Sequence, residues 1–454
     1  MSDFAIVDQL PRPDAAAAVY ESGWQSWSPS GLYRLDQAPP RPSTDRSAAI
    51  SYRPGRRPEP GRFQGEGLLL LDLPESQQCR VWSSTNPGLE VPTIRLSVEG
   101  RFVQVEADGP IVSETVAGSP APVLARHFSG LGRQLGARLA DVSFPGVWCS
   151  WGFHRRGVVA ADVDEAVDQV ERWDLPVDIF LVDDGWQLEI GDWRPERPGF
   201  GGLEALAGRL RSRGRRLGLW VAPFLVGSHS HLASKHPEWL LDGPTHPRCW
   251  GQGIAVLDLT NPDAGRHLQS QFQRLCELGC SYFKLDFLYA GAWPGRPSHG
   301  AGPLDAYRHG MGLIRAAVGP QTTLVGCGAP LLPSVGLVDA MRVSPDIALH
   351  RHPAAGDLSQ PALDSALFTG RARAGMHQRL WVNDPDMLLA RPRMPDRDLW
   401  AEHIARVGGV VASGDRLADL DSHGRDLLRS ALHRRAHRPV AWLPSLDGSQ
   451  GSLG

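Results

Sequence analysis

The 454-residue sequence predicts an α/β chain in which a (β/α)8 barrel follows an N-terminal β-sandwich-like domain. Three observations predict this fold. Roughly the first 120 residues show the two-residue alternation of apolar and polar side chains that is typical of strands. From about residue 144, short apolar runs alternate with amphipathic helical stretches. A helical segment separates these two patterns.

The N-terminal β-sandwich-like domain is predicted to span residues 1–123. Residues 94–98 alternate between apolar and polar side chains, and Gly100 permits a turn into a second strand at Phe102–Glu106. Two further strands are predicted at Leu68–Leu71 and Arg80–Trp82. A linker helix over residues 124–143 then leads into the second domain.

The barrel is predicted to span residues 144–432, because eight apolar runs within it have the length of strands. These runs are Gly146–Cys149, Ile179–Val182, Leu217–Val221, Tyr282–Leu285, Thr323–Val325, Met341–Val343, Leu380–Val382 and Gly409–Val411. Apolar residues at helical spacing separate several of the runs. Eight strand–helix units over about 280 residues match the size of a (β/α)8 barrel. Residues 433–454 are predicted to form a short C-terminal tail.

The composition excludes several classes of function. A net charge of −3 gives no basis for binding nucleic acid or an anionic membrane surface. The sequence has no run of about 18 apolar residues that would span a bilayer. Residues 1–13 have no signal-peptide core, and six cysteines are too sparse for a disulfide framework, so we expect a cytoplasmic protein. Because no metal or phosphate motif has the required spacing, neither metal nor cofactor is expected. The oligomeric state stays open, a homo-oligomer included.

Polar residues gather where the predicted strands end, which is where a (β/α)8 barrel carries its working residues. They are Trp148–Trp151, Asp183–Asp184, Trp220, Lys284–Asp286, Cys327, Arg342–Asp346 and Asn383–Asp386. Any one of these Asp residues alone is explained as a helix cap or a turn. Acidic residues at several strand ends, mixed with Trp and Arg, favour one shared site instead.

Lys284 is one of only two lysines in a chain that otherwise uses Arg, so a compact ammonium group is favoured there. It lies two residues before Asp286 on a predicted strand, and both side chains therefore point to the same face. Paired carboxylates, tryptophan faces and no metal motif are typical of glycosidic bond cleavage. In that reaction one carboxylate traps the oxocarbenium-like carbon and another carboxyl group protonates the leaving oxygen.

Eight short motifs, in a fixed order, cover nearly the whole chain from Gly23 to about Leu420. They are Gly23–Trp27, Trp148–Trp151, Asp183–Trp186, Gly218–Phe224, Tyr282–Phe287, Gly326–Pro330, Met341–Asp346 and Trp381–Asp386. As a set they resemble the melibiase-like α-galactosidases of glycoside hydrolase family 36, in a short form. Relative to that family, the C-terminal β domain is expected to be missing or vestigial. The sequence departs from the family at Gly152, where relatives often carry Tyr, and this departure predicts an open wall of the pocket.

The resemblance implies Asp286 as the nucleophile and Asp346 as the acid/base. The implied substrate-binding residues are Trp27, Trp151, Asp183, Asp184, Trp220, Lys284, Cys327 and Arg342. Within that set, Asp183 and Asp184 would bind the axial O4 and the O6 of galactose.

The activity implied by the resemblance is a retaining exo-α-galactosidase that acts on galactose-containing oligosaccharides by double displacement. Two alternatives stay open. One is a galactosyltransferase of raffinose-synthase type, which shares the covalent intermediate but passes the galactosyl group to a sugar alcohol. The other is a non-catalytic carbohydrate-binding barrel, against which the presence of both Asp286 and Asp346 argues, because a binding protein needs no nucleophile.

Overall fold

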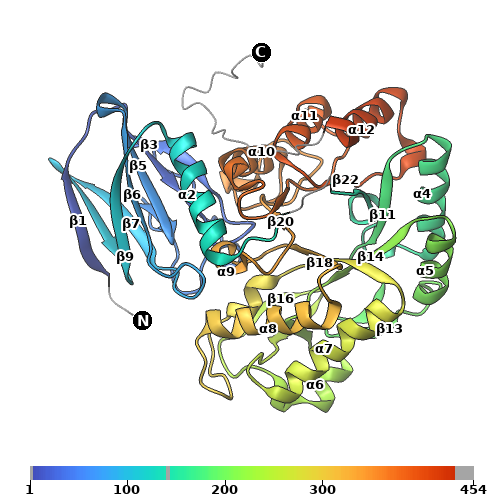
Figure 1. The fold of residues 1–454 in the computed structure, drawn as a ribbon. Coiled ribbons are helices and arrows are strands. Elements are labelled where there is room, and N and C mark those ends of the chain that lie inside the picture. The colour runs from blue at the N-terminus through green and yellow to red at the C-terminus, as the bar shows by residue number, and fades with distance from the viewer. Residues whose placement is uncertain (1–3, 140–143, 435–454) are drawn as a thin grey trace.

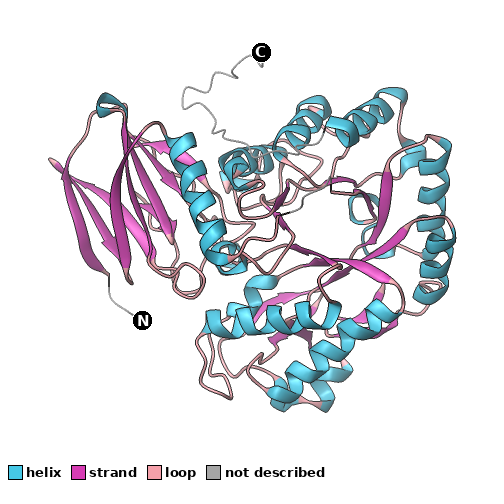
Figure 2. Cartoon of the chain, in the orientation of Figure 1, coloured by secondary structure: helices cyan, strands magenta, loops and turns pink. Residues whose placement is uncertain are grey.

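The computed structural model describes residues 4–139 and 144–434. A β-sandwich formed by the N-terminal part packs beside a ring of strands and helices formed by the rest of the chain (Figure 1). Figure 2 shows that helices surround the strands of the second region, whereas the first consists mainly of strands. The predicted α/β class, with a barrel after a sandwich, is confirmed.

The sandwich has two antiparallel sheets, in the orders β1-β8-β7-β4 and β3-β2-β5-β6-β9. Their strands are β1 (Ala5–Pro11), β2 (Ala18–Glu21), β3 (Gly31–Arg34), β4 (Phe63–Glu66), β5 (Leu68–Leu73), β6 (Gln78–Ser84), β7 (Thr93–Glu99), β8 (Phe102–Ala107) and β9 (Ile111–Ala117). The predicted hairpin is β7–β8, and the two further predicted strands lie in β5 and β6. Side chains such as Leu69, Trp82 and Leu96 fill the space between the sheets. The sequence analysis missed the remaining strands.

Two helices border the sandwich. Helix α1 (Asp45–Ser51) begins after Thr44, whose Oγ1 accepts a hydrogen bond of 3.0 Å from the backbone N–H of Ser47. Helix α2 (Pro120–Leu135) begins four residues earlier than predicted, since a proline is tolerated in the first turn of a helix. It ends at Gly136, whose φ of 68° lies in the left-handed region that favours glycine. The last part of the predicted linker, residues 140–143, lies outside the described residues.

The second region is a barrel of eight parallel strands in the order β21-β20-β19-β18-β14-β11-β10-β22. The strands are β10 (Gly146–Cys149), β11 (Val177–Val182), β14 (Arg216–Val221), β18 (Cys280–Leu285), β19 (Thr323–Gly326), β20 (Ala340–Arg342), β21 (Val382–Asp384) and β22 (Val411–Ser413). The ring closes where the backbone N–H groups of Gly409 and Val410 both donate to the carbonyl of Asn383, at 3.0 and 3.1 Å.

The last two barrel strands begin two residues later than predicted. Leu380 and Trp381 are buried but precede β21, whereas the polar Asn383 and Asp384 belong to it. The apolar runs therefore predict the bounds of these two strands poorly, because the ends of barrel strands carry polar side chains toward the mouth.

The helices that cover the barrel are α3 (Trp151–His154), α4 (Ala160–Arg172), α5 (Leu203–Ser212), α6 (His231–Lys235), α7 (Pro262–Glu277), α8 (Pro303–Val318), α9 (Leu331–Ser334), α10 (Leu363–Ala372), α11 (Arg397–Val407) and α12 (Ser422–Arg434). Two insertions extend the loops at the mouth. They are the hairpin β12 (Gln187–Glu189)–β13 (Asp192–Glu196) and the sheet of β15 (Leu225–Gly227), β16 (His246–Cys249) and β17 (Gln252–Val256). The predicted tail lies almost wholly outside the described residues, beyond 434.

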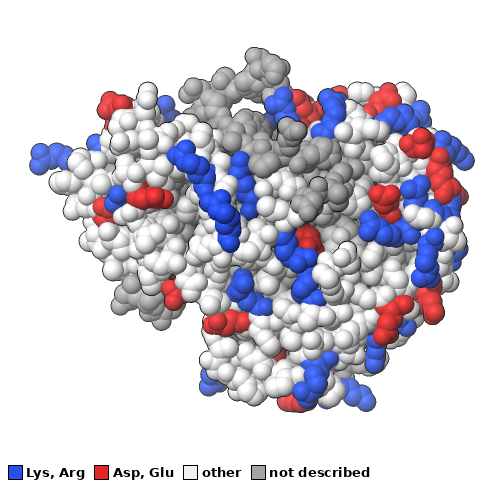
Figure 3. Space-filling model, in the orientation of Figure 1, with Lys and Arg blue, Asp and Glu red and all other residues white. Residues whose placement is uncertain are grey.

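The distribution of charged side chains on the surface of the barrel is consistent with the small net charge of the chain. On the barrel side of the face in Figure 3, basic and acidic side chains are interspersed. Arg213, for example, pairs with Glu171 of the neighbouring helix α4. Within residues 4–139 and 144–434, no helix is long and apolar enough to cross a membrane.

A buried arginine joins the two domains. Arg373, just after α10, is fully buried and donates to three backbone carbonyls of residues 25–28 at 2.7–3.0 Å. It also donates to Ser30 Oγ at 3.0 Å and to the carbonyl of Val343 at 3.2 Å. Burial lowers the pKa of Arg373 to about 10. A buried charge is costly unless it is hydrogen-bonded, so these contacts fix the 25–28 loop against the barrel.

Candidate active site

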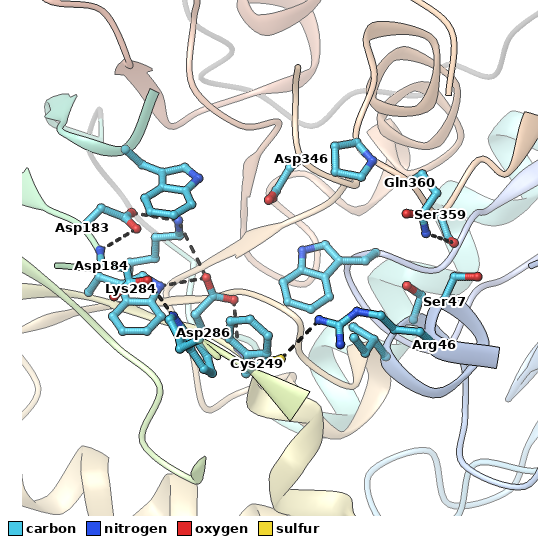
Figure 4. Close-up of a pocket in the computed structure, with 18 of the residues that line it drawn as sticks. Arg46, Ser47, Asp183, Asp184, Cys249, Lys284, Asp286, Asp346, Ser359 and Gln360 are labelled. Carbon is cyan, nitrogen blue, oxygen red and sulfur yellow. Dashed lines mark hydrogen bonds and ion pairs between the residues drawn. The ribbon is translucent and has the colours of Figure 1, made fainter. Parts of the chain in front are cut away.

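A cavity of about 410 Å³ lies at the carboxyl ends of the barrel strands, where the barrel meets the N-terminal domain (Figure 4). Most of the predicted site residues line it: Trp27, Trp151, Asp183, Asp184, Trp220, Lys284, Asp286 and Asp346. These side chains come from segments more than 300 residues apart in the chain. The two other predicted residues, Cys327 and Arg342, are not among the described residues that line the cavity. Both are buried behind its wall.

Asp286 follows strand β18, and hydrogen-bond donors hold both of its carboxylate oxygens. Its Oδ2 accepts from Trp220 Nε1 at 2.9 Å, and its Oδ1 accepts from the backbone N–H of Phe287 at 2.8 Å. Phe287 has a φ of 53°, in the left-handed region that is uncommon outside glycine. The turn after β18 thus takes an unusual backbone conformation at the residue that donates to Asp286.

Lys284 lies between two carboxylates. Its Nζ donates to Asp183 Oδ2 at 2.9 Å and lies 3.8 Å from Asp286 Oδ2. Burial alone lowers the pKa of Lys284, but Asp183 and Asp286 together raise that pKa well above its ordinary value. Lys284 is therefore charged and stabilises both carboxylates. We call Asp183, Trp220, Lys284 and Asp286 the nucleophile cluster, after the nucleophile role predicted for Asp286.

Asp184, the neighbour of Asp183, is held by two donors of its own. Gln187 Nε2 donates to its Oδ1 at 2.6 Å, and Trp250 Nε1 donates to its Oδ2 at 2.8 Å. Burial raises the pKa of Asp184, and these two hydrogen bonds act in the opposite direction. Trp250 was not predicted as a site residue, because it lies in the β16–β17 turn of an insertion and not at the end of a barrel strand.

Asp346 follows strand β20 and faces the cavity from another side than Asp286 (Figure 4). Its Oδ1 accepts from Arg342 Nη1 at 3.0 Å. Desolvation within the cavity raises the pKa of Asp346; the negative charge of Asp286 raises it further, while Arg342 lowers it. A carboxyl group with a raised pKa close to an ionised one has the properties of a general acid.

Arg342 is turned away from the cavity surface. Its Nη2 lies 2.8 Å from Asp386 Oδ1, and its Nε lies 3.5 Å from Asp384 Oδ2. Together with Asp346, these carboxylates surround the guanidinium group. The structure thus places Arg342 behind Asp346, and its contact with ring hydroxyls stays a prediction. We call Arg342, Asp346 and Asp386 the acid/base cluster.

Cys327 is also behind the wall. It follows β19 and is 1% exposed, and its backbone N–H donates to the carbonyl of Leu285 at 2.8 Å. Burial raises the pKa of the Cys327 thiol well above its ordinary value, so the thiol stays neutral. Its role in this structure is to pack beneath the nucleophile cluster.

Trp27 brings the N-terminal domain to the cavity. Its ring meets that of Phe287 edge to face, with centroids 5.2 Å apart. Gly328 permits this approach: its φ is 53°, and a Cβ there would lie 3.0 Å from the Trp27 ring. Trp27 Nε1 is buried and has no hydrogen-bond partner among the described residues, so it is the rest of the indole ring that faces the cavity.

The expectation of an open wall at Gly152 is wrong. A Cβ on Gly152 would lie 2.2 Å from the carbonyl oxygen of Gly414 and 2.8 Å from Met387 Sδ. The backbone after β22 and the Met387 side chain therefore fill the space that a larger residue would need.

A second part of the cavity wall was not predicted. It is formed by Thr44, Arg46, Ser47, Ile50 and Ser51 from the α1 region, Cys249 and Phe287, and the segment Ser359–Pro361. Arg46 connects α1 to strand β16, since its guanidinium donates to the carbonyl of Arg248 at 2.6 Å and to Cys249 Sγ at 3.4 Å. The capping pattern at Thr44–Ser47 indicates a helix start in the sequence, but nothing in it shows that this helix reaches the barrel mouth.

Over the part of the chain that is described, no group of three or more His, Cys, Asp or Glu side chains is arranged to hold a metal ion.

Part of the chain is similar in sequence to known proteins. Residues 159–290 match the melibiase family model. The chain is 36% identical over 98 residues to α-galactosidase AgaA of Geobacillus stearothermophilus and 31% identical over 121 residues to an α-galactosidase of Escherichia coli. These matches cover 20% and 25% of this chain, but only 13% and 17% of the two relatives.

Similarity to solved structures extends over nearly the whole chain. An α-galactosidase of Thermus thermophilus, in complex with p-nitrophenyl α-D-galactopyranoside, has a TM-score of 0.76 and 28% identity, covering 94% of this chain and 88% of that one. Its stachyose complex gives a TM-score of 0.77 and 27% identity, with coverage of 94% and 92%. These findings confirm the predicted resemblance to the family 36 α-galactosidases.

Proposed function

We propose that this chain is a retaining exo-α-galactosidase that hydrolyses terminal α-galactosyl residues of oligosaccharides by double displacement. One observation carries the proposal: two carboxyl groups with different surroundings face one cavity. Asp286 accepts two hydrogen bonds and lies 3.8 Å from the Lys284 ammonium group. Asp346 has a raised pKa, which favours its protonated form. The similarity to the Thermus enzyme, whose structures hold a nitrophenyl galactoside and stachyose, supports the sugar class.

In the first step, the Asp286 carboxylate attacks the anomeric carbon, and the bond from that carbon to the leaving oxygen breaks. The Asp346 carboxyl group donates its proton to the leaving oxygen, so the leaving group departs neutral. The product of this step is a galactosyl ester of Asp286. Trp220 Nε1 and the Phe287 N–H fix the orientation of the attacking carboxylate.

In the second step, water attacks the same carbon, and the ester bond to Asp286 breaks. Asp346, now ionised, takes the proton of the water and returns to its starting state. Two inversions at one carbon give net retention of the anomeric configuration.

The nucleophile cluster and Asp184 supply the groups for sugar recognition. Asp183 and Asp184 would accept hydrogen bonds from O4 and O6, while Lys284 would donate to another hydroxyl and the Trp27 ring would cover part of the sugar. A site built around such hydrogen bonds rejects an epimer strongly, because its buried polar groups are then left unpaired.

The test is activity on a panel of nitrophenyl α- and β-glycosides, with the product anomer followed by NMR. Release of nitrophenol from the α-galactoside, with little from the α-glucoside and β-galactoside, and α-galactose as the first product, is the expected result. Equal rates on both α-glycosides, or β-galactose as the first product, contradict the proposal. Tight galactoside binding without turnover would identify a carbohydrate-binding barrel instead.

A galactosyltransferase of raffinose-synthase type is the second candidate. It is favoured by the polar side chains Arg46, Ser47 and Gln360 in the part of the cavity formed outside the nucleophile cluster, since a sugar acceptor needs such partners. Product analysis with added sugar alcohols separates the two activities, because a transferase forms a new galactoside in place of free galactose.

A further inference from the structure

Asp386 is a buried carboxylate that the proposed mechanism does not use. It lies just beyond β21, is 0% exposed and has a φ of 92°, a backbone conformation that favours glycine. A side chain in such a conformation is strained unless its surroundings hold it. The contacts of its carboxylate therefore point to what the side chain does.

Each carboxylate oxygen of Asp386 contacts a group that is linked to Asp346, either through the backbone or through a hydrogen bond. Oδ2 accepts a hydrogen bond of 2.7 Å from the backbone N–H of Ile347, the residue directly after Asp346. Oδ1 lies 2.8 Å from Arg342 Nη2 and accepts from the N–H of Met387 at 2.7 Å. The other end of the same guanidinium group, Nη1, donates to Asp346 Oδ1 at 3.0 Å.

Asp386 thus holds Asp346 in two ways: through the backbone of the next residue and through Arg342. We propose that Asp386 is a positioning residue that holds the acid/base Asp346 in the orientation and charge environment needed to transfer a proton to the leaving oxygen. This inference rests on the proposed function.

The charged groups around Asp386 come from three strands. They are Arg342 and Asp346 from β20 and the segment after it, Asp384 from β21 and Lys284 from β18. The pKa of Asp386 is raised to about 7: burial is the largest cause, Arg342 and Lys284 act in the opposite direction, and Asp346 and Asp384 add to the rise. Because the influence between Asp346 and Asp386 is mutual, removal of the negative charge of Asp386 lowers the pKa of Asp346.

The test is the Asp386→Asn variant, which keeps the shape of the side chain but removes its charge. On a galactosyl disaccharide, whose leaving group needs a proton, we expect kcat to fall on the order of a hundredfold, the lower end of a general acid's contribution. On p-nitrophenyl α-galactoside, whose leaving group needs little protonation, we expect a loss below about tenfold. The alkaline limb of the pH profile on the disaccharide should shift to lower pH, since Asp346 then loses its proton earlier.

Asp415→Asn is the matched control. Asp415 is also a buried carboxylate near a strand end, where it pairs with Arg391 at 2.6 Å and accepts from the N–H of Ala390 at 2.6 Å, but it does not line the cavity. Any effect of this variant should be the same on both substrates, with no shift of the pH profile.

A double-mutant cycle supplies a second, independent measurement. If Asp386 acts through Asp346, adding Asp386→Asn to Asp346→Ala should cost less than about threefold more on the disaccharide, where Asp386→Asn alone costs on the order of a hundredfold. Should Asp386→Asn not fold, Asp386→Glu, which keeps the charge but displaces it, should show the same greater loss on the disaccharide.

Equal losses on both substrates, an unmoved alkaline limb or multiplicative losses in the cycle would overturn the positioning role while the wild type remains active. A wild type without activity on any α-galactoside would instead overturn the proposed function itself.

Discussion

The nucleophile cluster and the acid/base cluster face the same cavity but are built differently. The side chain of Asp286 is 9% exposed, and donors occupy both of its oxygens. The side chain of Asp346 is 41% exposed, and its carboxylate is held by Arg342 alone among the described hydrogen bonds. Asp286 is thus enclosed by its donors. Asp346 is supported indirectly by the fully buried Asp386, which contacts Arg342 and the backbone N–H of Ile347.

The difference follows from what each group has to do in the proposed reaction. A nucleophile keeps one protonation state until it reacts, so direct hydrogen bonds that stabilise its charge help it. An acid/base changes its protonation state in each step, and donors placed on both of its oxygens would hold it ionised. Support through the backbone and through a shared arginine orients the group without fixing its proton.

Asp286→Asn should have the largest effect of the variants that test this difference between the two clusters. We expect kcat on every galactoside to fall by ~10⁴-fold or more, because no covalent intermediate forms. The loss should be independent of the leaving group. The thermal unfolding midpoint and galactose binding are the controls for an intact site. Turnover within tenfold of the wild type would refute the assignment of the nucleophile.

Asp346→Ala should have the next largest effect, and that effect should depend on the leaving group. We expect losses of about 10²–10⁴-fold on a galactosyl disaccharide and a smaller loss on the nitrophenyl galactoside. Added azide should restore part of the turnover and give the α-galactosyl azide. Identical losses on both substrates would assign the proton transfer to another carboxyl group.

The pH dependence of kcat/KM also tests the acid/base role of Asp346. Asp346 acts in its protonated form, and its pKa is raised, so kcat/KM on the disaccharide should fall as the pH rises through that pKa. In Asp346→Ala this alkaline limb should disappear. A limb that persists unchanged in the variant would show that a different group titrates.

Trp250→Phe should weaken sugar discrimination by about tenfold, the effect of one hydrogen bond to a charged group. An aromatic ring remains at position 250, but Asp184 loses the indole N–H donor that orients its carboxylate. The measurement is the ratio of kcat/KM for the α-galactoside to that for the α-glucoside. Trp239→Phe, in the same insertion but stacked on His236, is the control and should leave the ratio as it is.

Arg46→Met should have the smallest effect. Its guanidinium lies on the α1 side of the cavity, so we expect KM for the disaccharide to rise by about two- to fivefold while KM for the nitrophenyl galactoside stays constant. Arg57, which pairs with Asp45 at the start of the same helix, offers the control variant Arg57→Met. An equal rise on both substrates would assign Arg46 to the galactose side.

The sequence predicted the parts of the site that belong to strand ends, because a barrel brings those ends together whatever its loops do. Asp183, Lys284 and Asp286 could be placed in this way. Trp250 and Arg46 could not, since they lie in an insertion and a short helix whose positions depend on packing between distant segments. The contacts of Arg342 with Asp384 and Asp386 could not be predicted either, because no local pattern reveals which carboxylates surround a buried guanidinium group.

Arg373 has a consequence for how the molecule folds and for how it can be divided. Its guanidinium is buried against carbonyls of the 25–28 loop, so a barrel separated from the N-terminal domain would lose most of the acceptors of this cation and expose it to water. Because these hydrogen bonds cross between the two regions, the regions should unfold in one cooperative transition and not as independent modules. A cut near residue 120, which looks like a natural boundary in the sequence, would break these hydrogen bonds, and engineering by domain exchange would have to carry this loop along with the barrel.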